Sequence, residues 1–178
     1  MKKSYKILLL ISIIALGTVI AVVFGTQKEI MPVGSSLPKL RYVSLKDSGF
    51  ISIKNKPLMV MYFKPDCPHC EYELKTMNNR ITEMNGMDII IITADKKYIL
   101  DTVYDRWKNL SVAENVEFGW VDQKDYNEKI GINVTPVFIF FNTNEKLINK
   151  IIGETKFDRL LEPIRRSDGS KHQSGGLN

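Results

Sequence analysis

Three uninterrupted apolar runs, each followed by a segment with helical periodicity, leave this chain few folds to adopt. The runs are Leu58–Phe63, Met87–Thr93 and Val116–Val121. The predicted helices follow them: Cys70, Leu74, Met77, Ile81 and Met84 share one face of the first, and Lys96–Leu110 and Tyr126–Ile130 are the others. Continuous apolar strands joined by helices indicate a parallel sheet with helices on both faces.

The last part of the predicted domain adds a hairpin and a final helix. Val137–Phe141 and Leu147–Ile152 flank turn residues, so we expect two antiparallel strands at one edge of the sheet. Phe157–Arg165 has a helical pattern, although Pro163 should break or kink its last turn. The predicted fold class is therefore an α/β sandwich with a central mixed sheet, and we place its domain at residues 39–166.

An apolar segment precedes this domain. Residues 7–24 carry no charge and only two polar side chains, Ser12 and Thr18, which is the lower limit for a helix that crosses a bilayer. Lysines in residues 1–6 should keep that end in the cytoplasm, so the domain would face the periplasmic or extracytoplasmic side. We predict a single-pass anchor in a bacterial cytoplasmic membrane at 7–24, a linker at 25–38 and a disordered tail at 167–178. Cleavage near Gly25, as in a signal peptide, is the alternative.

The excess positive charge lies outside the predicted domain. The chain has a formal net charge of +5, but residues 39–164 contain 18 basic and 18 acidic side chains. A groove for nucleic acid would need its basic surplus on the folded domain. The charge distribution therefore argues against nucleic acid as a partner.

The two cysteines, Cys67 and Cys70, lie where the first strand meets its helix. A disulfide between them would close a very short loop and add little stability, which favours redox chemistry over a structural role. Pro68 suits a first helical turn, so Cys67 should lie at the helix start, where free N–H groups stabilise a thiolate. A protonated His69 would add to this effect. Cys70, on the apolar face, should be the buried resolving thiol.

Metal and haem sites fit the cysteine motif poorly. Haem attachment requires a histidine directly after the second cysteine, where this chain has Glu71. Tetrahedral zinc requires about four ligands, and the chain has only two cysteines and two histidines. We therefore predict no metal and no cofactor.

These segments together resemble the thioredoxin superfamily and, within it, the membrane-anchored TlpA/ResA-like thiol–disulfide oxidoreductases, over about residues 33–162. Val33–Pro38 is similar to that branch's leading segment before the first strand, residues 63–70 to its active-site segment, and residues 134–136 to the superfamily's cis-proline loop. Gly153 after the hairpin also matches. The resemblance implies a thioredoxin-like sandwich.

The resemblance also implies roles for residues beyond the cysteines. Pro136 would be cis, with the Thr135 backbone facing Cys67 and pairing with substrate like an added strand. Glu73 falls where the TlpA/ResA-like branch often has an acid near the thiols. It would accept the proton of Cys70, or else be an ordinary solvated helix glutamate.

The implied function is thiol–disulfide exchange on exported proteins, with reduction of the substrate disulfide as the favoured direction. A membrane electron-transfer partner would supply the electrons. The Pro68-His69 dipeptide is instead the one found in strongly oxidising DsbA-like proteins, so an oxidant is the main alternative. A peroxiredoxin-like peroxidase would want Thr or Ser where Lys64 stands. A copper-delivery protein would use a distant histidine, which the predicted domain lacks.

Overall fold

The computed structural model describes residues 12–18 and 31–169, which fall into two units divided between Ile30 and Met31. Residues 12–18 are helical and lie inside the predicted anchor. The remainder of residues 7–24 and the basic end at 1–6 lie outside the described residues. Within the part that is described, no helix combines the length and apolarity that crossing a membrane requires. The anchor therefore stays a prediction.

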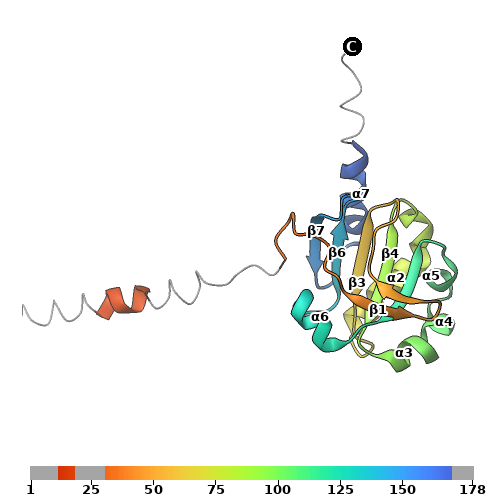
Figure 1. Ribbon diagram of the computed structural model, residues 1–178, viewed down its shortest axis with the longest axis horizontal. Coiled ribbons are helices and arrows are strands. Elements are labelled where there is room, and N and C mark those ends of the chain that lie inside the picture. Colours follow the sequence, from red (N-terminus) through yellow and green to blue (C-terminus); the bar gives the residue numbers. More distant parts are fainter. Residues whose placement is uncertain (1–11, 19–30, 170–178) are drawn as a thin grey trace, which may run out of the picture. The chain divides into compact units, whose positions relative to one another are not determined.

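Within residues 31–169, seven strands form one mixed sheet (Figure 1). They are β1 (Arg41–Ser44), β2 (Ser48–Phe50), β3 (Leu58–Tyr62), β4 (Asp88–Thr93), β5 (Val116–Trp120), β6 (Val137–Phe141) and β7 (Leu147–Ile152). Their order across the sheet is β2-β1-β5-β4-β3-β6-β7. The central strands β3, β4 and β5 are parallel, and the strands on either side of them are antiparallel. The predicted parallel centre and antiparallel hairpin are confirmed.

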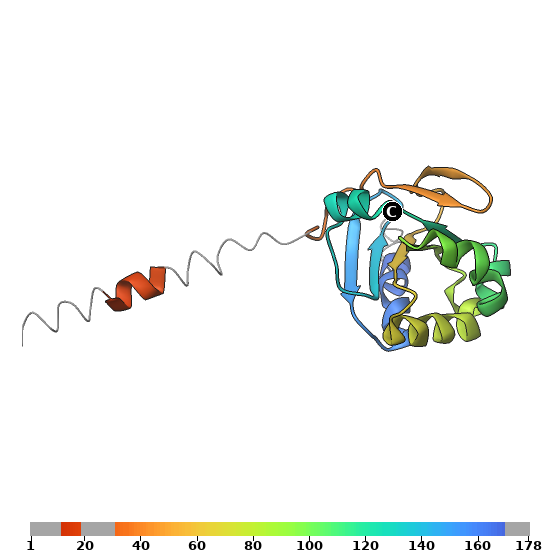
Figure 2. The ribbon, with the colours of Figure 1, turned by 90° about the horizontal axis from the view of Figure 1, so that it is seen from below.

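Helices cover both faces of this sheet, as predicted (Figure 2). They are α2 (Pro68–Arg80), α3 (Lys96–Asp101), α4 (Val103–Arg106), α5 (Lys108–Val112), α6 (Gln123–Lys129) and α7 (Phe157–Gly169), with a 3-10 turn at Ile81–Met84. Side chains alternate along a strand, so β3 contributes Met59 and Met61 to the core under α2, α5 and α7, and Val60 and Tyr62 to the core under α6. All five residues of β3 are buried, so the strand that leads into the cysteine segment is held from both sides.

The predicted linker at 25–38 is wrong for residues 31–38, which pack on the domain. The Gly34 N–H donates to the Leu147 carbonyl at 2.8 Å, and the Leu147 N–H donates to Ser35 at 2.8 Å. Met31 and Leu37 lie against the buried cluster on the α6 face. The Gly and Pro residues that mark a linker instead shape turns here, and these turns let the backbone pair with β7. Residues 25–30 lie outside the described residues.

The strand that the family resemblance implies after Pro38 is β1, but its partner β2 was not predicted. Ser48 and Phe50 of β2 are both exposed, and β1 buries only Ser44 fully. A strand at the edge of a sheet with so little buried surface lacks the alternation of apolar and polar residues by which strands are predicted.

The single helix predicted at Lys96–Leu110 is wrong, because the segment forms three short helices, α3, α4 and α5. The chain leaves helical geometry at Thr102 and again at Trp107. The Trp107 ring is buried, and its indole N–H donates to the Tyr98 hydroxyl at 3.1 Å. The two bends let the segment follow the twisted sheet while its apolar residues stay in the core, a tertiary requirement that overrides helical periodicity.

Two other helices extend beyond their predicted bounds. Helix α6 begins at Gln123 rather than Tyr126, because the Asp122 carboxylate caps it by accepting from the Asp125 N–H at 2.9 Å. Helix α7 passes through Pro163 and ends at Gly169, because Pro163 lies on its buried face and packing there offsets one lost hydrogen bond. The disordered tail predicted at 167–178 is therefore wrong for 167–169, and residues 170–178 lie outside the described residues.

Candidate active site

Sheet register brings three distant segments to one place. Tyr62, the last residue of β3, pairs with Val137 at the start of β6, and Val137 pairs with Ile152 at the end of β7. The residues just beyond this row are therefore neighbours: the cysteine segment after β3, Pro136 before β6, and Gly153 after β7. The Gly153 N–H donates to the Pro136 carbonyl at 2.7 Å and joins two of the segments directly.

Cys67 is the N-cap of α2, as the sequence predicted, and Pro68 is the first helical residue. The Cys67 backbone is extended, with φ −96° and ψ 110°, and its sulfur accepts the N–H of Cys70 at 3.2 Å. Cys67 as a residue is partly exposed, whereas Cys70 is buried. A free backbone donor at a helix start stabilises negative charge that develops on the atom that accepts it.

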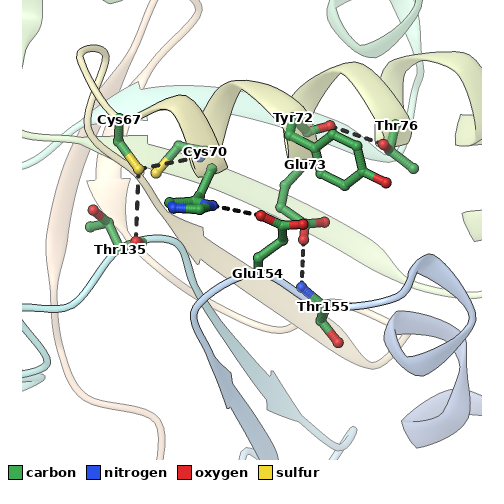
Figure 3. A network of polar contacts seen from close by, with 9 residues as sticks. Cys67, Cys70, Tyr72, Glu73, Thr76, Thr135, Glu154 and Thr155 are labelled. Carbon is green, nitrogen blue, oxygen red and sulfur yellow. Dashed lines mark hydrogen bonds and ion pairs between the residues drawn. The ribbon is translucent and has the colours of Figure 1, made fainter.

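Cys70 lies one turn into α2 and is 1% exposed, among the core residues under that helix. Both cysteines are free thiols in the structure (Figure 3). Burial raises the pKa of the Cys70 thiol well above its ordinary value, and the neighbouring Cys67 adds to the rise. The two cysteines therefore differ as a nucleophile and a resolving thiol must. Cys67 is partly exposed and its sulfur accepts an N–H, whereas Cys70 is buried and its raised pKa favours the protonated thiol.

The Thr135–Pro136 peptide bond is cis, as the resemblance implied. The Thr135 carbonyl faces Cys67 and accepts from its sulfur at 3.7 Å (Figure 3). Pro136 is buried and Thr135 is partly exposed. The structure thus brings the cysteine pair and the cis-proline loop into one site.

His69 points away from the core and is 66% exposed. Its Nδ1 lies 2.6 Å from Glu154 Oε2, in the segment between β7 and α7. Sequence reasoning missed Glu154, although Gly153 beside it had been matched to the family pattern. The sequence feature that could have indicated Glu154 is its position directly after Gly153.

Glu73 is 0% exposed, so the solvated alternative for this residue is wrong. Its Oε1 accepts the Thr155 N–H at 2.6 Å (Figure 3). Among the described residues, neither Glu73 Oε2 nor the Thr155 hydroxyl has a hydrogen-bond partner. Burial raises the pKa of the Glu73 carboxyl, the Thr155 N–H opposes this, and the charge of Glu154 adds to it. Over the described residues, no group of three or more His, Cys, Asp or Glu side chains is arranged to hold a metal ion.

The chain belongs to the thioredoxin-like family, because the sequence model of that family, described as a thioredoxin-like domain, matches residues 50–166. This match covers the cysteine pair, the cis-proline loop, Glu73 and Glu154. Among curated proteins, none matches the sequence significantly.

Solved structures share the fold at low identity. A peroxiredoxin-like protein from Aquifex aeolicus superposes with a TM-score of 0.65 at 15% identity, covering 78% of this chain and 89% of that one. The thioredoxin domain of a thiol-disulfide oxidoreductase from Bacteroides vulgatus gives 0.59 at 18%, covering 76% and 97%. A thio-disulfide isomerase from Thermus thermophilus gives 0.57 at 14%, covering 76% and 96%. At these identities the similarity establishes the fold.

Proposed function

We propose that this protein is a thiol–disulfide oxidoreductase of the TlpA/ResA-like branch, with Cys67 and Cys70 as its redox pair. One observation carries the proposal. Cys67 is partly exposed and caps α2, with its sulfur accepting the Cys70 N–H and facing the Thr135 carbonyl, while Cys70 is buried one turn behind it. A structural disulfide would gain nothing from a partly exposed cysteine at a helix start.

The chemistry follows from this asymmetry. The Cys67 thiolate attacks one sulfur of a substrate disulfide, forming a mixed disulfide and releasing the other substrate sulfur as a thiolate that takes a proton from water. Cys70 then loses its proton and attacks Cys67. That step breaks the mixed disulfide, releases the second substrate thiol and leaves Cys67–Cys70 oxidised. The substrate gains two electrons and the cysteine pair loses them, so an electron donor must reduce the pair again. We propose a membrane electron-transfer partner as that donor.

The substrate backbone is proposed to lie along Thr135. This residue precedes β6, is partly exposed and has its carbonyl directed to Cys67, as strand-like pairing with an extended peptide requires. Val134 directly precedes Thr135, and Ile152 pairs with Val137 in the sheet. Both are exposed apolar side chains, and we propose that they contact the substrate. We propose exported proteins with disulfides as the substrates, since the predicted anchor would hold the domain outside the cytoplasm.

Reduction is the proposed direction, with a DsbA-like oxidant as the alternative. The pairing of His69 with a carboxylate supports reduction, because it opposes the effect of an imidazolium on Cys67. We expect a reduction potential between roughly −150 and −240 mV, between the extremes for strong oxidants and thioredoxin. Equilibration of the purified domain with glutathione redox buffers measures it. A value near −120 mV would assign the oxidant role instead.

Catalysis itself is tested by reduction of a protein disulfide with dithiothreitol as the electron source. The wild-type chain should accelerate this reaction, and it should consume hydrogen peroxide no faster than a variant without cysteines. Peroxide consumption without disulfide exchange would contradict the proposal and favour the alternative hypothesis of a peroxiredoxin-like peroxidase.

Membrane attachment through residues 7–24 is proposed together with this function. The full chain should stay in the membrane fraction through carbonate and high-salt washes, because an apolar segment of that length is held by burial in lipid rather than by charge. A chain that begins at Met31 is the matched control and should be released. A soluble mature form beginning near Gly25 would show that the segment is a cleaved signal.

A further inference from the structure

A carboxylate that takes no part in the bond-forming steps described above lies directly against the cysteine motif. Glu154 Oε2 is 2.6 Å from the Nδ1 of His69, the residue between Pro68 and Cys70. The two side chains come from different parts of the fold, one from the first turn of α2 and the other from the segment that follows β7. Both are partly exposed, at 66% for His69 and 46% for Glu154.

The backbone on either side of Glu154 is held by the redox site itself. Gly153 before it has φ +84° and donates its N–H to the Pro136 carbonyl. Thr155 after it donates its N–H to buried Glu73 at 2.6 Å (Figure 3). Glu154 is thus placed by two main-chain hydrogen bonds to site residues, and its position over His69 does not depend on a free surface loop.

We propose that Glu154 is a positioning residue for the Cys67–Cys70 redox pair. Its carboxylate holds His69 through Nδ1 and offsets the positive charge of the protonated His69 ring. The proposal rests on the function proposed above. An ionised carboxylate can only accept hydrogen bonds, so the Nδ1 of His69 must carry the proton in this contact. The other ring nitrogen, Nε2, is then the one without a proton when the ring is neutral.

The direction of the effect on the redox equilibrium follows from charge. With Glu154 present, His69 and Glu154 together carry a net charge of zero or minus one. Without the carboxylate, the same two positions carry zero or plus one. Removing Glu154 therefore makes the surroundings of Cys67 more positive or leaves them unchanged. Positive charge favours the thiolate, hence the reduced form of the protein, and makes the Cys67–Cys70 disulfide a stronger oxidant. Glu154 therefore makes the Cys67–Cys70 couple more reducing than it would be without this carboxylate.

The first experiment measures the equilibrium constant with glutathione for wild type and Glu154→Gln. Exposed ion pairs couple weakly, so we expect a change of about two- to fivefold toward the reduced protein. Glu114→Gln is the matched control: it removes an exposed carboxylate before β5, at the opposite end of the parallel strands, and should leave the constant unchanged. An unchanged constant in Glu154→Gln, or an equal change in the control, would overturn the proposal.

The second experiment observes His69 directly and does not depend on the redox activity of the protein. Nitrogen-15 shifts of the ring at about pH 8.5, roughly two units above the usual imidazole titration, report the tautomer. Wild type should hold the Nδ1–H form, and Glu154→Ala should change to the Nε2–H form that neutral histidine prefers in water. His69→Val assigns the signal, since the chain also contains His172.

The two experiments separate the inference from the proposed function. An Nε2–H ring in wild type contradicts the role of Glu154 even if disulfide exchange is active. An Nδ1–H ring in a protein that exchanges no disulfides supports the contact and contradicts the function instead.

Discussion

Replacing Cys67 with serine should abolish disulfide exchange, whereas replacing Cys70 with serine should trap the protein in mixed disulfides with its substrates. The reason lies in the different surroundings of the two sulfurs. Cys67 is partly exposed and its sulfur accepts the N–H of Cys70, and Cys70 is buried with a raised pKa. Loss of the attacking thiolate should cost roughly a thousandfold or more in rate, because that sulfur forms the first bond.

Non-reducing electrophoresis of both variants after incubation with a disulfide substrate measures the outcome. A variant with both serines is the control, since it keeps the shape of the site and has no sulfur there. Serine is close to cysteine in size, so folding should be retained, and circular dichroism checks this. Trapping by Cys67→Ser rather than Cys70→Ser would show that the attacking and resolving roles are reversed.

Glu73→Gln should slow the release of substrate from the mixed disulfide by about a hundredfold, the lower range of what a positioned proton acceptor contributes. Cys70 must lose its proton to attack Cys67, and burial makes that loss unfavourable. Glu73 is three residues further along α2, on the same buried face, with one carboxylate oxygen free of hydrogen bonds among the described residues. Its raised pKa makes it a stronger base than an exposed glutamate.

Rapid mixing of a preformed mixed disulfide, followed by the appearance of free substrate thiol, measures this step. Glu71→Gln is the matched control on the same helix, because Glu71 is exposed and pairs with Arg106 at the surface. Its release rate should equal that of wild type. Equal rates for Glu73→Gln and wild type would remove Glu73 from the proton transfer.

The same variant has an effect on stability whose sign can be worked out. The folded-state pKa of Glu73 is raised from its ordinary 4.5, so the folded chain binds this proton more tightly than the unfolded chain. The resulting stability is fully present below the ordinary pKa and is lost as pH rises through the raised value. The free energy of unfolding of wild type should therefore fall relative to that of Glu73→Gln as the pH rises above the ordinary value of 4.5. Denaturant titrations of both proteins over that rise in pH test it, and equal changes in the two proteins would contradict a buried carboxylate.

Sequence alone determined the centre of the fold and the reactive pair. Uninterrupted apolar runs such as Leu58–Phe63 can be buried only between two layers, so the parallel strands and their covering helices followed from local patterns. Pro68 after Cys67 marked the helix start, and the apolar spacing from Cys70 marked the buried side of that helix. Each of these inferences uses residues that are close in the chain. A local pattern is enough to predict them.

Only the tertiary structure decided which side chains surround the pair. Glu154 lies 85 residues beyond His69, and Thr155 lies 82 beyond Glu73. Their contacts exist because Tyr62, Val137 and Ile152 share one row of the sheet, which brings the ends of β3 and β7 and the start of β6 together. Periodicity shows that a segment is a strand but does not show the register in which it pairs with distant strands. A residue such as Glu154 therefore reads as an ordinary surface acid until the sheet is assembled.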